Sequence, residues 1–198
     1  MGVIFYLIGK SCAGKDSIYN ILIKDAELGL KSVVRYTTRP IRDGETDGVT
    51  YHFVDEESYG RFRDEGKIIE EQAYDTVHGL WRYFTADDGR ITIDSDDYLA
   101  IGVLESFAGT RDYFGEDRVL PIYIELDDGE RLARALERER LPENGRYAEM
   151  CRRFLADAED FREERIKELG ITDDARFVND DLEDCAKRIK SWILRLIR

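Results

Sequence analysis

The feature that most constrains this chain is a glycine-bearing loop between a strand pattern and a helix pattern. Residues Val3–Ile8 form a continuous apolar run, which is typical of a buried strand. A helix pattern follows, and its apolar positions are Ile18, Ile21, Leu22 and Ala26. Between the two, Gly9 to Lys15 match the pattern G-x-x-x-x-G-K. This context predicts a loop whose inward-facing backbone N–H groups, together with the helix N-terminus, bind phosphate groups.

Two residues of this loop region carry most of the predicted chemistry. The ammonium group of Lys15 is expected to reach the terminal phosphates of a bound nucleotide. The position after this lysine usually holds Ser or Thr, whose hydroxyl binds Mg²⁺, but here it is Asp16, followed by Ser17. A carboxylate at this position either binds the metal, directly or through water, or caps the first turn of the helix. The sequence leaves both interpretations of Asp16 open.

Composition limits the classes of partner. The chain has 198 residues, enough for one α/β domain with small insertions, and its formal net charge is −13. Such a charge disfavours nucleic acid and anionic membranes as partners, so phosphate binding requires a local cationic cleft. Cys12, Cys151 and Cys185 are scattered, which favours neither disulfides nor a zinc site and fits a reducing cytoplasm. No signal peptide is expected, so we predict a cytoplasmic protein.

Alternating apolar runs and helix patterns predict an α/β fold with a parallel sheet. The predicted core strands are Val3–Ile8, Lys31–Tyr36, Tyr98–Leu104, Val119–Glu125 and Ala175–Val178. Helices are predicted after the first strand, from about Leu132 to a turn at residues 141–145, from Tyr147 to Phe161 and from Leu182 to Leu196. From Thr37 to about Phe84, short extended pieces surround one helix at about Glu56–Glu65, which predicts an inserted subdomain.

A second candidate anion site lies at the start of this insertion. Arg39 and Arg42 are three residues apart, and Pro40 rigidifies the segment between them. Two guanidinium groups in this arrangement can hold a dianionic phosphate, and Tyr51 adds a phenolic donor. By composition alone, the same segment is also compatible with a solvated charged turn.

The ordered string from Thr37 to Phe53 resembles the T-T-R-x-x-R-x-G-E-x-x-G-x-x-Y-x-F signature of guanylate kinases. Ile69-Glu70, His78-Gly79 with Tyr83 nearby, and the segment Val178–Leu182 are similar to further motifs of that family, in the expected order. The resemblance implies a P-loop kinase fold, with a five-stranded parallel sheet flanked by helices, a small nucleoside monophosphate-binding subdomain and a short lid. It divides a single domain into a core (1–36 and 85–198), an insertion (37–84) and a lid (about 138–148).

The resemblance also implies a reaction and its residues. The reaction is transfer of the ATP γ-phosphoryl group to GMP or dGMP, with ATP and Mg²⁺ as cofactors, by a monomer or homodimer. The residues implied for ATP are Gly9, Lys10, Ser11, Cys12, Ala13, Gly14, Lys15, Asp16, Ser17 and Asn179. Those implied for GMP are Arg35, Arg39, Arg42, Tyr51, Glu70, Tyr83 and Glu105, with Glu70 accepting hydrogen bonds from the guanine edge. Those implied for catalysis are Lys15, Arg138 and Arg153, and Asp16 is the candidate for Mg²⁺.

The chain departs from the family pattern at Asp16, at Arg35 (usually a Ser that touches base and phosphate), at Glu105 (in place of an Asp that contacts guanine) and around Val77–Thr85. In the last segment Trp81, Arg82 and Tyr83 all compete for the phosphate-facing tyrosine position. For the arginines after Leu132, a solvated helix face with pairs to Glu137 or Glu149 remains an alternative. Three alternatives for the whole chain also stay open: a kinase for another nucleoside monophosphate, an inactive module that binds phosphopeptides, and a nucleotide-hydrolysing switch.

Overall fold

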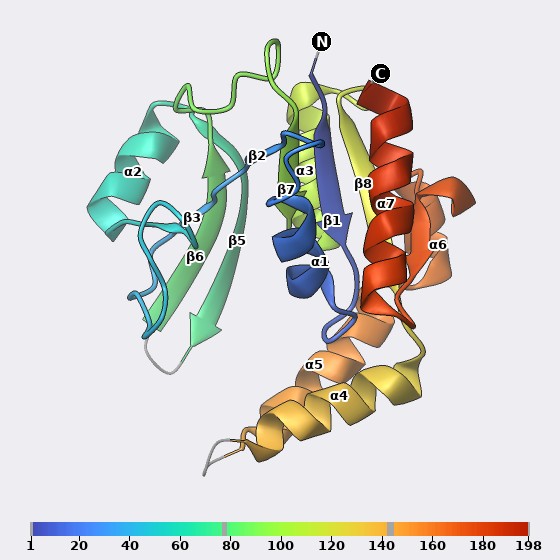
Figure 1. Ribbon diagram of the computed structural model, residues 1–198. Coiled ribbons are helices and arrows are strands. Elements are labelled where there is room, and N and C mark those ends of the chain that lie inside the picture. The colour runs from blue at the N-terminus through green and yellow to red at the C-terminus, as the bar shows by residue number, and fades with distance from the viewer. Residues whose placement is uncertain (1, 77–78, 142–144, 198) are drawn as a thin grey trace.

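The structure is a computed structural model that describes residues 2–76, 79–141 and 145–197. Within these residues, five strands form a parallel sheet in the middle of the molecule (Figure 1). In order across the sheet they are β2 (Lys31–Ser32), β7 (Tyr98–Ile101), β1 (Ile4–Ile8), β8 (Val119–Glu125) and β9 (Arg176–Val178). The central strand β1 pairs with β7 on one side and with β8 on the other. This arrangement confirms the predicted five-stranded parallel sheet.

Helices cover both faces of this sheet, so β1 is buried on each side. Ile4 and Tyr6 belong to an apolar cluster with α3 (Leu104–Phe114) and α6 (Glu163–Glu168). Phe5 and Leu7 belong to the cluster on the other face, with α1 (Lys15–Leu22) and α7 (Leu182–Ile197). Because successive side chains of a strand point to opposite faces, an uninterrupted apolar run is what a strand in this position requires.

A second sheet lies beside the first and is mainly antiparallel (Figure 1). Its strands, in order, are β4 (His52–Phe53), β3 (Tyr36–Thr37), β6 (Gly79–Ala86) and β5 (Ile68–Thr76). Helix α2 (Glu56–Asp64) packs Tyr59 against Tyr36 and Phe84 on one face of this sheet. The opposite face carries polar side chains and is directed towards the first sheet. The sheet spans Tyr36 to Ala86, and the division into core, insertion and lid remains a prediction.

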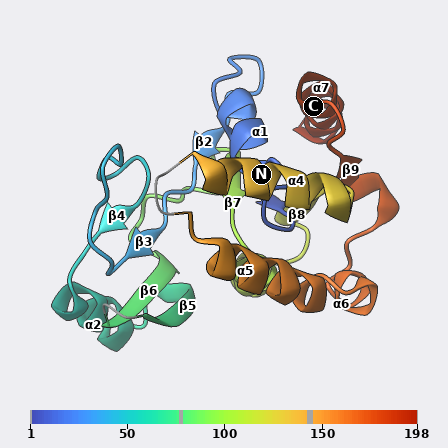
Figure 2. The same ribbon diagram turned by 90° about the horizontal axis from the view of Figure 1, so that it is seen from below.

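Two helices project from the edge where the strands of the first sheet end. Helix α4 (Asp128–Arg140) follows β8, and α5 (Tyr147–Asp160) runs back beside it; Figure 2 shows the pair from below. None of the residues of α5 is buried. The remaining described element before β9 is a short 3₁₀ segment, Asp173–Ala175.

Three segments differ from the sequence prediction. The predicted strand Lys31–Tyr36 is divided between the two sheets, because the chain passes from β2 in the first to β3 in the second. The predicted strand Tyr98–Leu104 ends at Ile101, and α3 begins at Leu104. Helices α3 and α6 are absent from the prediction. Of the predicted turn at residues 141–145, positions 142–144 lie outside the described residues.

Two leucines provide a matched test of where the core lies. Leu99 of β7 is fully buried, whereas Leu196 of α7 is 47% exposed. Replacing Leu99 by alanine is expected to lower the free energy of unfolding by about 2–5 kcal/mol, because it removes buried methyl groups and leaves a cavity. The Leu196→Ala control is expected to change it by less than about 1 kcal/mol. Urea denaturation of both variants measures the difference, and equal effects would contradict the assigned core.

Candidate active site

The phosphate-binding loop predicted from sequence connects β1 to α1. Its last glycine, Gly14, has φ 94°, in the left-handed region that side chains rarely adopt. A Cβ atom at this position would also lie 2.2 Å from Nδ2 of Asn179. Glycine is therefore required at residue 14 both for its backbone conformation and for the close approach of Asn179.

Asn179 directly follows β9 and is hydrogen-bonded to this loop. Its backbone N–H donates to the carbonyl of Glu125 (2.8 Å), and its Nδ2 donates to the carbonyl of Ala13 (2.7 Å). The side chain is buried, and its Oδ1 has no hydrogen-bond partner among the described residues. Asn179 thus reaches the loop through its amide nitrogen and leaves one buried acceptor unused.

Lys15 is folded back under the loop. Its Nζ donates to the backbone carbonyls of Gly9 (2.6 Å) and Lys10 (3.1 Å). Burial lowers the pKa of Lys15, and the charges of Asp16 and Asp157 oppose this effect. Asp16 is exposed in the first turn of α1, and no side-chain hydrogen bond caps that helix. Asp16 therefore lies where either interpretation places it, and the choice between metal binding and capping stays open.

A buried arginine joins this loop to the projecting helices. Arg131 of α4 is 1% exposed, and its Nε donates to the carbonyl of Ser11 (2.9 Å). Its two terminal nitrogens donate to Asp128 (2.5 Å) and to Oδ2 of Asp157 on α5 (2.7 Å). The same Asp157 oxygen accepts the backbone N–H of Ser11 (2.8 Å). The Asp157 carboxylate therefore accepts the hydrogen bond of the Ser11 N–H, one of the loop N–H groups predicted to bind a phosphate oxygen.

The sequence analysis missed both Arg131 and Asp157. The available signal was the position of Arg131 one helical turn before the buried Ala135, on the inward face of α4. The arginines chosen for catalysis lie elsewhere: Arg138 is exposed near Glu139 (3.6 Å), and Arg153 pairs with Glu149 (2.8 Å). Arg153 therefore forms the ion pair with Glu149 on the helix face that the sequence analysis left as an alternative. Arg134 lies closer to the loop, donating to the carbonyl of Asn179 (3.4 Å).

The predicted second anion site centres on Arg39, which is 4% exposed. Its guanidinium lies over the rings of Tyr51 (5.2 Å) and Phe53 (5.4 Å) and forms a two-point ion pair with Glu45. Its Nε is buried with no hydrogen-bond partner among the described residues. An unpartnered buried donor at this point is suited to an oxygen of a bound anion.

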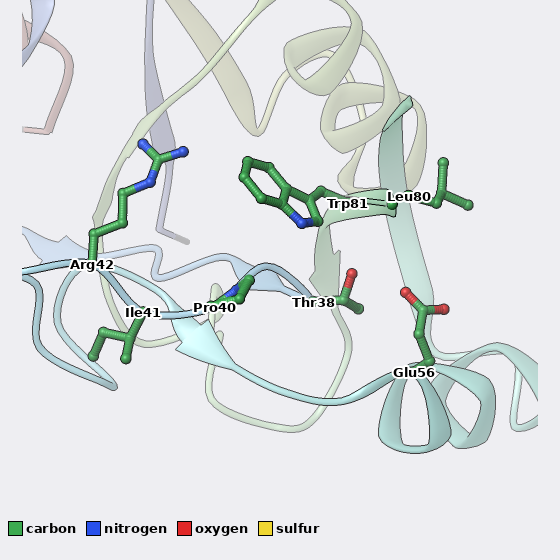
Figure 3. A pocket seen from close by; sticks show the side chains of 8 residues that line it. Thr38, Pro40, Ile41, Arg42, Glu56, Leu80 and Trp81 are labelled. Atoms are coloured by element: carbon green, nitrogen blue, oxygen red, sulfur yellow. The ribbon is translucent and has the colours of Figure 1, made fainter. Parts of the chain in front are cut away.

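Arg42 lies next to this pair, and its backbone N–H donates to Glu45 (2.8 Å). Its guanidinium lies 5.6 Å from the ring of Trp81. The two side chains border an open cavity of about 570 Å³ (Figure 3). The other residues that line it are Thr38, Pro40, Ile41, Glu56, Gly79 and Leu80.

Strand alternation separates Arg82 from the other two residues that compete for the phosphate-facing tyrosine position, because Trp81 and Tyr83 point to the same face of β6. Tyr83 of β6 packs edge to face on Tyr51, with ring centres 5.6 Å apart. The adjacent Arg82 points to the other face, where it lies over Tyr59 of α2. Tyr83 therefore contacts Tyr51 and Trp81 contacts Arg42, so both stay candidates for that position, while His78 lies outside the described residues.

The residues predicted to recognise the base are placed differently. Arg35 and Glu70 form a two-point ion pair on the polar face of the second sheet, with N–O distances of 3.0 and 2.9 Å. Glu105, in the first turn of α3, pairs with Arg165 of α6 at 2.6 Å. Arg35 and Glu70 are thus paired with each other, and Glu105 has a separate partner in Arg165.

Within the described part of the chain, no group of three or more His, Cys, Asp or Glu side chains is arranged to hold a metal ion. Likewise, no helix among residues 2–76, 79–141 and 145–197 has the length and apolar character needed to span a membrane.

The Arg39–Glu45 pair predicts an acid sensitivity. Hydrogen bonding to Arg39, opposed in part by burial, lowers the pKa of Glu45 from 4.5 to about 2. Because the folded-state pKa is depressed, the ionised carboxylate stabilises the fold fully above about pH 4.5, and this contribution is lost as the pH falls towards 2. The gap in unfolding free energy between wild type and Glu45→Gln is therefore expected to shrink from pH 6 to pH 3.

Urea denaturation at several pH values measures this gap. Glu57→Gln is the matched control, because the Glu57 side chain is 82% exposed and pairs only loosely with Arg61 (3.6 Å). A gap that stays constant between pH 6 and pH 3 would show that Arg39 does not depend on the charge of Glu45.

Comparisons with known proteins agree with this geometry. The family model described as "Guanylate kinase" matches residues 3–79. A guanylate kinase from Symbiobacterium thermophilum is 30% identical over 199 aligned positions, covering 98% of this chain and 85% of the relative. One from Salinibacter ruber is 32% identical, covering 96% of each. The crystal structure of guanylate kinase from Anaplasma phagocytophilum superposes with a TM-score of 0.64 at 25% identity, over 98% of this chain and 85% of that one. The chain belongs to the guanylate kinase family.

Proposed function

We propose that this chain transfers the γ-phosphoryl group of ATP to GMP, giving ADP and GDP. Family membership supports the reaction class, and one observation supports the site: the two anion-binding regions approach each other. Burial has the largest effect in raising the pKa of Tyr51, and the charges of Arg35 and Arg39 lower it while that of Asp16 raises it. Tyr51, which directly precedes β4 (His52–Phe53), lies beneath the guanidinium of Arg39, with Cζ 5.2 Å from the ring centre, and the first turn of α1 acts on it through the charge of Asp16.

On the donor side, the loop and Lys15 bind the ATP phosphates. The two hydrogen-bond partners of Lys15 are neutral carbonyls, so its positive charge remains available to the terminal phosphates. Asp157 has to release the Ser11 N–H when a phosphate oxygen takes its place. Because Asp157 belongs to α5, ATP binding is coupled to movement of the projecting helices, which carry Arg138 and Arg153.

On the acceptor side, Arg39, Arg42 and Tyr51 hold the phosphate of the nucleoside monophosphate. The attacking group is an oxygen of that phosphate, which is largely deprotonated at neutral pH, so the reaction requires no strong general base. Catalysis then depends on positioning the two phosphates in line and neutralising the charge on the transferred group. Lys15 on the donor side and Arg39 and Arg42 on the acceptor side supply that neutralisation.

The first turn of α1 also fits a role in metal binding. Mg²⁺ bound there would neutralise charge on the β- and γ-phosphates, and it needs only one or two protein oxygens besides phosphate oxygens. Asp16 and Ser17 are both exposed in this turn and are the residues that would hold it. The exposure of Asp16 leaves its carboxylate accessible for this role.

An assay of ADP formation from ATP, Mg²⁺ and a panel of nucleoside monophosphates tests the proposal. We expect turnover that depends on the acceptor. Lys15→Ala is expected to lower kcat at least about 100-fold, because it removes a charge that stabilises the transferred group. Lys24→Ala is the matched control, since Lys24 is exposed beyond the C-terminal end of α1.

Both variants should show the wild-type circular dichroism spectrum and thermal midpoint within a few degrees. Acceptor-independent ATP hydrolysis, or phosphopeptide binding without turnover of any acceptor, would contradict the proposal. Full activity in Lys15→Ala would contradict the assignment of the loop.

A further inference from the structure

The carboxylate of Glu70 has no capacity left for a ligand. Its side chain is 3% exposed, and each of its two oxygens accepts two hydrogen bonds. Oε1 accepts from Nε of Arg35 (3.0 Å) and from the hydroxyl of Thr85 (2.5 Å). Oε2 accepts from Nη2 of Arg35 (2.9 Å) and from Nε2 of Gln72 (2.8 Å). A carboxylate offers about four acceptor positions, so this one is saturated by the protein itself.

Arg35, the partner of Glu70, offers hydrogen-bond donors and no acceptor. Nη2 of Arg35 also contacts Oε1 of Gln72 (2.5 Å) and the carbonyl of Tyr83 (3.3 Å), whereas Nη1 has no hydrogen-bond partner among the described residues. An arginine nitrogen can only donate. The family resemblance predicts that Glu70 accepts hydrogen bonds from the base. At this place the structure instead offers the N–H donors of Arg35.

This group lies beside the proposed acceptor phosphate site. Glu70 and Gln72 are on the face of β5 opposite to α2, and Gln72 is paired in register with Tyr83. Helix α3 closes this region on the core side, since a Cβ atom at Gly109 would lie 2.6 Å from Cβ of Glu70. Nη2 of Arg35 donates to the carbonyl of Tyr83 (3.3 Å), and the ring of Tyr83 packs on that of Tyr51 (5.6 Å), which links Arg35 to the proposed phosphate ligands. A base attached to that phosphate would therefore meet Arg35.

The nucleobase edges differ in what they can offer to such a donor. The N1 and N2 positions of guanine carry N–H groups and need an acceptor, which Glu70 cannot supply while Arg35 holds it. The O6 and N7 atoms of guanine are acceptors, and hypoxanthine has the same pair but lacks the 2-amino group. Adenine has an amino group at position 6, which would leave two donors facing each other unpaired.

We propose that Arg35 determines the specificity of the acceptor site by withdrawing Glu70 from the base and donating to the acceptor edge of a 6-oxopurine. This inference rests on the proposed function. It implies that GMP and IMP are phosphorylated with similar efficiency, because Glu70, the acceptor that the family resemblance implies for the 2-amino group, is already saturated by Arg35, Gln72 and Thr85. AMP is a poor acceptor, because its 6-amino group opposes Arg35.

The test is the ratio of kcat/KM values for GMP and IMP with the wild-type chain and saturating Mg²⁺-ATP. The expected ratio is below about 10, with AMP at least about 100-fold poorer than either. A buried carboxylate that accepts from the 2-amino group would instead favour GMP by about 10-fold or more, the effect of one charge-assisted hydrogen bond. The wild-type ratio alone therefore decides whether Glu70 recognises that group.

Variants test whether Arg35 is the cause. Arg35→Ser releases Glu70 and is expected to raise the GMP-to-IMP ratio at least about 10-fold. Adding Glu70→Gln to this variant is expected to reverse most of the increase, because the amide is a weaker acceptor. Arg63→Ser, on the exposed surface of α2, is the control that leaves the ratio unchanged. Thermal denaturation establishes that each variant is folded.

The possible failures are distinguishable. A wild-type ratio well above 10 would overturn the inference and leave the kinase function intact. An unchanged ratio in folded Arg35→Ser would overturn the role of Arg35. If neither GMP, IMP nor AMP is phosphorylated, the proposed function fails and the inference fails with it.

Discussion

The burial of β1 on both faces is the constraint on which the rest of the structure depends. All of its side chains are buried, and each such burial contributes roughly 1.5–3 kcal/mol relative to exposure. Because β1 pairs with both β7 and β8, a shift along its axis would break two ladders and expose apolar side chains to water. The strand therefore delivers Gly9 and the loop after it to one fixed place, at the edge where parallel sheets bind ligands.

The projecting helices depend on a different kind of interaction. Because α5 has no buried residue, its position against the loop relies on the ionic group formed by Arg131, Asp128 and Asp157. Removing one partner of such a buried group is costly, since it leaves an uncompensated charge. The loop and the two helices are thus joined through one group of hydrogen-bonded charges, in which Ser11 contacts both Arg131 and Asp157.

Much of the fold and part of the site could be predicted from the sequence. The apolar run of β1, the glycine pattern after it and the spacing of Arg39 and Arg42 are local signals, and local signals correspond directly to backbone geometry. Helix α3 lacked such a signal, because its start at Leu104 directly follows the end of a buried strand. The division of Lys31–Tyr36 between two sheets depends on pairing with β6 and β7, which no local pattern encodes.

The partners of charged side chains were the least predictable part. With 30 basic and 43 acidic residues, each arginine has many possible carboxylates, and only the tertiary fold selects among them. Arg131 meets Asp157 across 26 positions, and Arg35 meets Glu70 across 35. The ion pair of Glu70 with Arg35 is likewise a product of the tertiary fold, and the role that family resemblance implies for Glu70 stays a prediction.

The central claim is that the phosphate loop and the arginines of the second sheet face each other across one cleft. Calorimetric titration with adenosine and guanosine joined by a polyphosphate chain tests it most directly. The account predicts one bound molecule per chain, an affinity well above those of ADP and GMP separately, and a large loss of affinity in both Lys15→Ala and Arg42→Ala. Two bound molecules per chain, or an affinity equal to that of ADP alone and insensitive to Arg42→Ala, would contradict it.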